Sequence, residues 1–233
     1  MSDPAHGVSV VIPCFNGSRY VGAAIESVLD QSLPPLELIV VDDGSTDDTP
    51  AVLASYAGRV QGLRQAQRGS GAARNHGARV ARGRWIAFLD ADDLWLPDAL
   101  ERLFAPTEDA GAVWTVGRVR QFVSPDLDPA EAARLKVPEG SAHARAAGAM
   151  LLERETFLAV GGFSSAFRAG EFMDLSARLE DAGVQPVSVD ADVVRRRLHA
   201  ANMMRAGREL QLEYLKVLAA TRARRRAGAA PPA

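Results

Sequence analysis

Three carboxylates follow a short apolar segment near the middle of the chain. Trp85–Leu89 has the length and composition of a buried strand, and Asp90, Asp92 and Asp93 come directly after it. Like charges a few ångströms apart resist joint ionisation, so this cluster needs a compensating charge. A divalent cation with oxygen ligands, Mn²⁺ or Mg²⁺, shared with a substrate phosphate would supply it. The other interpretation is a turn whose aspartates cap the following helix.

A second acidic pair, Asp42 and Asp43, ends another apolar segment, and the whole first half alternates strands with helices. Strands are expected at Val8–Pro13, Leu36–Val41, Val60–Arg64 and Trp85–Leu89. This alternation predicts an α/β fold, a mainly parallel twisted sheet with helices on both faces. In a sheet of strand order 3-2-1-4, ligands bind beyond the carboxyl ends of the strands, between strands 1 and 4. We therefore expect both acidic strand ends to lie on the same edge of the sheet, the edge at the carboxyl ends of the parallel strands, which we call the rim.

Composition limits the function classes. The chain has 233 residues, 47% of them hydrophobic, which is enough for a full core. Its 27 basic and 29 acidic residues nearly cancel, which argues against nucleic acid as a partner bound through bulk charge. Cys14 is the only cysteine, so no internal disulfide is possible. Neither a signal peptide nor an apolar run long enough to span a bilayer is visible, and we expect a cytoplasmic protein without an integral membrane segment.

The second half carries weaker signals. Ala112–Phe122 is expected to form a strand, and Val184–Val189 and Val193–Arg197 two closing strands. The segment 124–140 is read either as a lid over the site or as a surface insertion. A helix over 205–226, basic at its end, is expected to dock on the domain or on another subunit, which would give a homo-oligomer; membrane contact stays open. Its apolar face should hold Leu210, Tyr214, Val217 and Leu218.

Several motifs taken together resemble those of family 2 glycosyltransferases with the GT-A fold. They are VSVVIPCFNG, LIVVDDGSTDDT, GSGAARNHGARVARGRWIAFLDADD and LLERETFLAVGGF. The resemblance implies a metal-dependent enzyme that transfers a sugar from a nucleotide-sugar, most simply a UDP-sugar, to an unidentified acceptor with inversion. It also implies a GT-A domain over 1–204, with a nucleotide-binding half at about 8–95 and an acceptor half at about 96–204. A C-terminal helix and basic tail would follow at 205–233.

The resemblance also assigns site residues. Asp42 would accept a hydrogen bond from the base, and Asp90 would contact the ribose or a metal-bound water. Asp92 would be the direct metal ligand, within the motif Asp90-Ala91-Asp92. The other residues implied in the nucleotide pocket are Pro13, Phe15, Asn16, Asp43, Ser45, Arg74, Asn75 and Ala91. His199 resembles a late family histidine that joins the metal or the diphosphate, and the alternative is a surface histidine in a basic stretch.

The chain departs from the family where a catalytic aspartate is expected. In the inverting members this aspartate opens the helix after the GGF motif and acts as general base, and here Phe172 holds its position. A phenyl ring cannot accept a proton, whereas a placed base contributes about 10²–10⁴-fold to the rate. Glu171 is our candidate base, and Asp174, about 300° further around the helix, is the second. A sugar-nucleotide-binding module that has lost catalysis is the alternative function.

A phospho-acceptor domain of the receiver type also clusters aspartates at the ends of parallel strands. It would need a lysine after a later buried strand, and the only lysines, Lys136 and Lys216, are not so placed. The sequence therefore disfavours this class.

Overall fold

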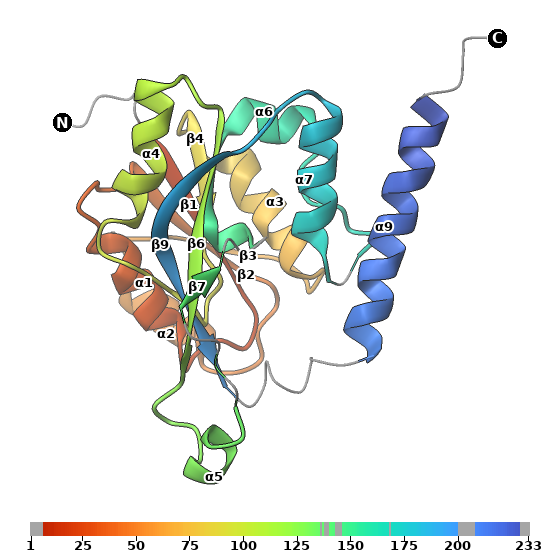
Figure 1. Cartoon of the computed structure of the whole chain (residues 1–233). Coiled ribbons are helices and arrows are strands. Elements are labelled where there is room, and N and C mark those ends of the chain that lie inside the picture. The colour runs from red at the N-terminus through yellow and green to blue at the C-terminus, as the bar shows by residue number, and fades with distance from the viewer. Residues whose placement is uncertain are drawn as a thin grey trace.

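A computed structural model of the chain describes residues 7–135, 137, 140–142, 146–167, 169–199 and 208–228. Its centre is a mixed sheet of the order β3-β2-β1-β4-β8-β6-β9-β5, with β7 paired to β6 (Figure 1). The strands are β1 Val8–Cys14, β2 Glu37–Asp42, β3 Gln61–Arg64, β4 Trp85–Phe88, β5 Leu94–Trp95, β6 Trp114–Val123, β7 Ser141–Ala142, β8 Met150–Glu153 and β9 Val187–Leu198.

Helices cover both faces of this sheet. The described helices are α1 Val21–Leu29, α2 Thr49–Ser55, α3 Ser70–Val80, α4 Ala99–Asp109, α5 Pro129–Ala132, α6 Arg154–Ala159, α7 Glu171–Asp181 and α9 Arg208–Gly228, with a 3-10 turn, η2, at Ala147–Ala149. Two of them do not cover the sheet: α5 lies away from it, and α9 lies outside α7 (Figure 1). Alternate residues of β1 point to opposite faces, so Ile12 packs with α1, α2 and α4 while Val11 packs with α3, α6 and α7. The α1 and α4 helices lie on one side in Figure 1, and α3 and α7 on the other.

The expected α/β architecture is confirmed, and its parallel character holds for the first four strands. β1 is parallel to β2 and β4, and β2 is parallel to β3, which gives the predicted order 3-2-1-4. The burial of every β1 residue explains why this strand reads as a continuous apolar run. Beyond β4 the sheet is mixed, because β8 runs antiparallel to both β4 and β6 while β6 and β9 are parallel.

The prediction of two closing strands, Val184–Val189 and Val193–Arg197, was wrong: β9 is one continuous strand. Asp190 and Asp192 lie between the two predicted strands. Their charges are offset by β6, where Arg118 Nη1 lies 2.6 Å from Asp190 Oδ1 and Arg120 Nη2 lies 3.0 Å from Asp192 Oδ2. These cross-strand pairs allow the acids to stay within the strand, and shifts in the β6–β9 register on either side of Arg118 accommodate them.

The C-terminal helix α9 packs on α7, as the docking prediction expected (Figure 1). Val217 is buried in this contact, and Arg225 Nε lies 2.6 Å from Asp181 Oδ1 of α7. Leu218 was wrongly placed on the docking face, because it is 55% exposed. The Leu210 side chain and the domain boundary at 204/205 lie outside the described residues. No helix in the described ranges combines the length and the apolar character that crossing a membrane requires.

Candidate functional site at the carboxyl ends of the strands

The loops after β1 and β2 are joined through Asn16 and Ser45. Asn16 has φ +49°, a left-handed conformation that asparagine tolerates better than most residues, and its backbone N–H donates to Ser45 Oγ over 2.9 Å. Its side-chain Oδ1 accepts from the Thr46 N–H over 2.8 Å. Asn16 and Ser45 therefore shape the rim. In the same loop Pro13 is buried and Phe15 is 41% exposed.

The two acids after β2 have different surroundings, although both are buried. Asp43 accepts hydrogen bonds from Gln65 Nε2 and from the backbone N–H groups of Arg68 and Gly69, so it fixes the loop that leads into α3. Asp42 accepts only from the Ser45 N–H, through Oδ1. Its Oδ2 accepts no hydrogen bond within the described residues, with Arg64 Nη1 3.2 Å away. Asp42 therefore has an acceptor available for a ligand, and Asp43 is already engaged.

Asp47 holds the β1 loop from the other side. It accepts from the Ser18 N–H over 3.1 Å and from the Thr49 N–H over 3.0 Å. Burial raises the pKa of Asp47, but the hydrogen bonds from Thr49 and Ser18 outweigh it and lower the pKa to about 2.

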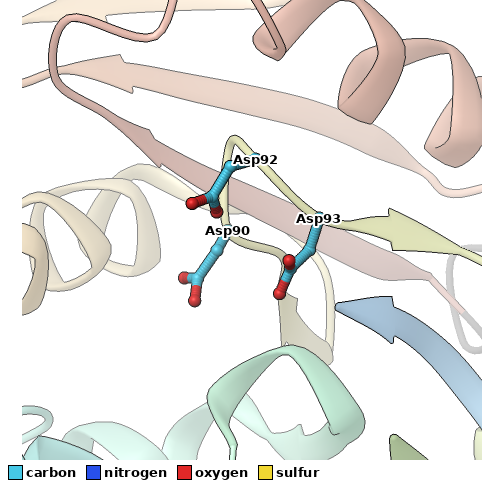
Figure 2. Close-up of side chains that lie close together, drawn as sticks. All are labelled: Asp90, Asp92 and Asp93. Atoms are coloured by element: carbon cyan, nitrogen blue, oxygen red, sulfur yellow. The ribbon is translucent and has the colours of Figure 1, made fainter. Parts of the chain in front are cut away.

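The acidic cluster after β4 brings three carboxylates to one place. Asp90, Asp92 and Asp93 leave the same short loop, and their ligand oxygens all lie within 4.8 Å of one another (Figure 2). Asp93 is buried, and its burial followed by the charges of Asp92 and Asp90 raises its pKa well above the usual range. A set of oxygen donors that repel one another in this way fits a hard divalent cation such as Mg²⁺ or Mn²⁺.

Arg74 connects this cluster to α7. Its guanidinium donates to Asp90 Oδ1 over 2.5 Å and to Glu171 Oε2 over 3.1 Å, and it lies 5.2 Å from the centre of the Phe163 ring. Burial lowers the pKa of Arg74, but the charges of Asp90 and Glu171 outweigh it and raise the pKa. Arg74 is thus a buried bridge between two carboxylates, and not a solvated charge on the face of α3.

His199 and Arg197, at the end of β9, reach the same cluster. His199 Nε2 lies 3.0 Å from Asp92 Oδ2, and its ring centre lies 4.8 Å from that of Tyr20. The Arg197 backbone N–H donates to Asp93 Oδ1 over 2.8 Å, and its Nε donates to the Asp92 carbonyl over 2.9 Å. His199 therefore lies beside the acidic motif, and its role at the metal or the diphosphate stays a prediction.

The first turn of α7 carries the candidate bases. Glu171 accepts from the Gly71 N–H, Ser70 Oγ and Arg74, all over 3.1 Å, so it caps the start of α3. A Cβ at position 71 would lie 2.6 Å from Glu171 Oε1, so a larger residue there would displace the Glu171 carboxylate. The ring of Phe172, at the position of the missing aspartate, is 8% exposed and packs in the core beneath α3 and α7.

Asp174, the second candidate base, belongs to a different environment. It is buried and pairs with Arg178 Nε over 2.8 Å and with Arg224 Nη1 of α9 over 3.3 Å. Both partners of Asp174 are arginines outside the acidic cluster of Asp90, Asp92 and Asp93. The structure thus brings Glu171, but not Asp174, into the network of Arg74 and Asp90.

Comparison with known proteins gives the family. A model of glycosyl transferase family 2 matches residues 9–170, more than half of the chain. The chain belongs to this family. The predicted family is thereby confirmed, and with it the assignment to a class of transferases.

Relatives of this family 2 chain match less than half of its length. Chondroitin synthase of Escherichia coli is 44% identical over 97 residues, which cover 40% of this chain and 14% of that protein. The succinoglycan biosynthesis protein ExoO of Rhizobium meliloti is 43% identical over 112 residues, covering 47% and 32%. The chain thus spans less than a third of the length of either relative. Among solved structures, the crystal structure of S. aureus TarS 1-349 in complex with UDP-GlcNAc matches with a TM-score of 0.67 at 16% identity. The match covers 86% of this chain and 61% of the TarS chain, so the two chains share a fold.

Some roles in this family 2 site were missed from the sequence. Asn75 was predicted in the nucleotide pocket, but its side-chain amide donates to the Phe163 carbonyl and accepts from the Phe163 N–H, both over 2.8 Å. Tyr20 was not predicted at all: its hydroxyl donates to Asp126 over 3.0 Å and ties the start of the 124–140 segment to α1. No local signal marks a contact between residues more than a hundred positions apart.

Proposed function

We propose that this chain transfers a sugar from a nucleotide-sugar donor, a UDP-sugar, to an acceptor hydroxyl with inversion and with a divalent metal. The observation that carries the proposal is the convergence of Asp90, Asp92 and Asp93 on the same rim as the available oxygen of Asp42. The TarS structures with UDP and with UDP-GlcNAc support the choice of uridine. The nucleotide-binding half would be about 8–95 and the acceptor half about 96–204, in a protein located in the cytoplasm.

Each side of the rim would have its own task. Asp42 Oδ2 would accept from the base, and Asp90 would hold the ribose or a metal-bound water. Asp92 would be the direct ligand of Mn²⁺ or Mg²⁺, with His199 beside it, 3.0 Å away. When bound, the cation would supply positive charge that neutralises the diphosphate. We assign Asp43, Asn16, Ser45 and Asn75 to the framework of the pocket, because their polar groups are used within the protein.

At the acceptor side, Glu171 is the proposed base. The acceptor oxygen would form a bond to the anomeric carbon, the bond from that carbon to the diphosphate would break, and the hydroxyl proton would pass to Glu171. Arg74 would hold Glu171 and Asp90 at a fixed separation, since it donates to both.

The second candidate function is a sugar-nucleotide-binding module without catalysis. It is favoured by the α7 geometry, because Phe172 is buried and Glu171 already accepts three hydrogen bonds. Hydrolysis of the nucleotide-sugar without an added acceptor separates the two functions, since a module that only binds should release no UDP.

Calorimetric titration with UDP tests the metal and the donor site together. We expect binding in Mn²⁺ that falls by about 100-fold in chelator or in Asp92→Ala, the scale of loss for a damaged metal site. Asp98→Ala is the control, because Asp98 is a nearby acid paired only with Arg102 on α4. Equal UDP affinity with and without Mn²⁺ would remove the metal from the proposal, and titrations with guanine and thymine nucleotides would test the base.

A further inference from the structure

The outer face of α9 is apolar in a way that the rest of the described surface is not. Seven large hydrophobic side chains are exposed within the described residues, and four of them lie on this helix: Leu212, Tyr214, Leu215 and Leu218. Tyr214 turns inward to contact Gly170, whereas the three leucines are 50%, 60% and 55% exposed. Residues three apart lie on neighbouring parts of one helix face, so these leucines form a single stripe, the leucine stripe.

Positive charge accompanies the leucine stripe. The segment 208–228 holds six basic and two acidic residues in a chain whose net charge is -2, so the remainder of the chain is distinctly acidic. Arg224 and Arg225 turn toward the acids of α7. Arg222 and Arg226 are exposed on the stripe side, and no acidic side chain of the described residues pairs with either.

We propose that the leucine stripe and Arg222 and Arg226 bind the surface of an anionic lipid bilayer, with α9 lying along the interface. Leucines that enter the boundary between headgroups and acyl chains, next to arginines that meet lipid phosphates, are the two components of such binding. The inner face of α9 stays on α7, through Val217 and the ion pairs of Arg224 and Arg225. The helix thereby joins the catalytic domain to the membrane without crossing it.

A second copy of the chain is the competing occupant. The leucine stripe extends over only two helical turns, a small area beside the roughly 800 Å² that each partner of a stable dimer buries. Arg222 and Arg226 lie beside the stripe, and no acidic side chain of the described residues pairs with them. Lipid phosphates would supply the negative charge that a second copy of this stripe lacks. This inference does not depend on the proposed transferase activity, because it concerns a different face of the molecule.

Flotation of the full chain with vesicles tests the proposal. We expect binding to vesicles that contain phosphatidylglycerol, little binding to phosphatidylcholine alone, and weakening at high salt. Leu215→Glu should weaken binding by about tenfold or more, the scale of one leucine removed from an apolar environment. Arg222→Glu and Arg226→Glu should each weaken it by about fivefold.

Val80→Glu is the matched control, because Val80 is also an exposed hydrophobic residue, 39% exposed, but lies on α3. It should bind vesicles like the wild type, and circular dichroism should show all variants folded. Absence of binding to phosphatidylglycerol vesicles, or equal binding by Leu215→Glu, would overturn the proposal. A dimer in light scattering that Leu215→Glu dissociates, without vesicle binding by the wild type, would instead make the stripe an interface between copies.

Discussion

Two acids on the rim, Asp42 and Asp93, differ from the acids of α7 in how well the protein satisfies them. On the rim, Asp42 Oδ2 lacks a hydrogen bond within the described residues, and Asp93 has a raised pKa among like charges. On α7, Glu171 accepts three hydrogen bonds and Asp174 pairs with two arginines. A buried group left unsatisfied costs free energy unless a ligand completes it. Asp42 and Asp93 are therefore the acids that the proposed metal and nucleotide would complete, whereas the acids of α7 are paired within the protein.

The largest effect is expected for Glu171→Gln, which tests whether Glu171 acts as a base or only caps α3. If Glu171 is the base, we expect turnover of the donor to fall by about 10²–10⁴-fold with unchanged UDP affinity, because only proton transfer is lost. Glu155→Gln on α6 is the control, since that side chain is 79% exposed. Unchanged turnover in Glu171→Gln would leave Glu171 as a cap of α3, and a parallel loss of UDP affinity would mean that it acts through Arg74 and Asp90.

Phe172→Asp tests whether the buried position 172 of α7 can hold the carboxylate that the family has there. We expect the free energy of unfolding to fall by about 3–5 kcal/mol, because the change removes a buried ring and places a charge among apolar side chains. Phe172→Leu should cost only about 1 kcal/mol. Urea denaturation measures both losses. A gain of donor turnover in Phe172→Asp over a wild type that shows none would make the wild type a binding module.

The parts that sequence analysis predicted are those set by local apolar runs and by topology. Buried parallel strands read as continuous hydrophobic segments, and the order 3-2-1-4 is enough to bring Asp42 and Asp90 to the same rim. The outer end of the sheet was harder, because the continuity of β9 depends on Arg118 and Arg120 offsetting its aspartates from another strand. Those pairs join residues about seventy positions apart, which no periodicity records.

The sequence names the residues expected in the candidate site, but it does not indicate which of their side chains are already hydrogen-bonded within the protein. Asp43 and Asn75 were predicted in the nucleotide pocket, and their side chains form hydrogen bonds with backbone groups of Gly69 and Phe163. Which polar groups of a pocket are already satisfied depends on loop conformation, and loops carry little pattern in the sequence. Family motifs therefore locate a pocket without separating its framework from its ligands.

The smallest effect on stability is expected for Asp47, a rim acid whose two carboxylate oxygens both accept hydrogen bonds within the protein. Its folded-state pKa of about 2 lies below the ordinary value near 3.9. A depressed pKa contributes stability that is present above the unfolded-state value and is lost as the pH falls through the folded-state value. Wild type should therefore exceed Asp47→Asn in free energy of unfolding by a constant amount near neutral pH, and the difference should shrink between about pH 4 and about pH 2. Urea denaturation of both proteins across that range measures it. A difference that does not change with pH would mean that Asp47 stabilises the β1 loop by geometry alone and not through its charge.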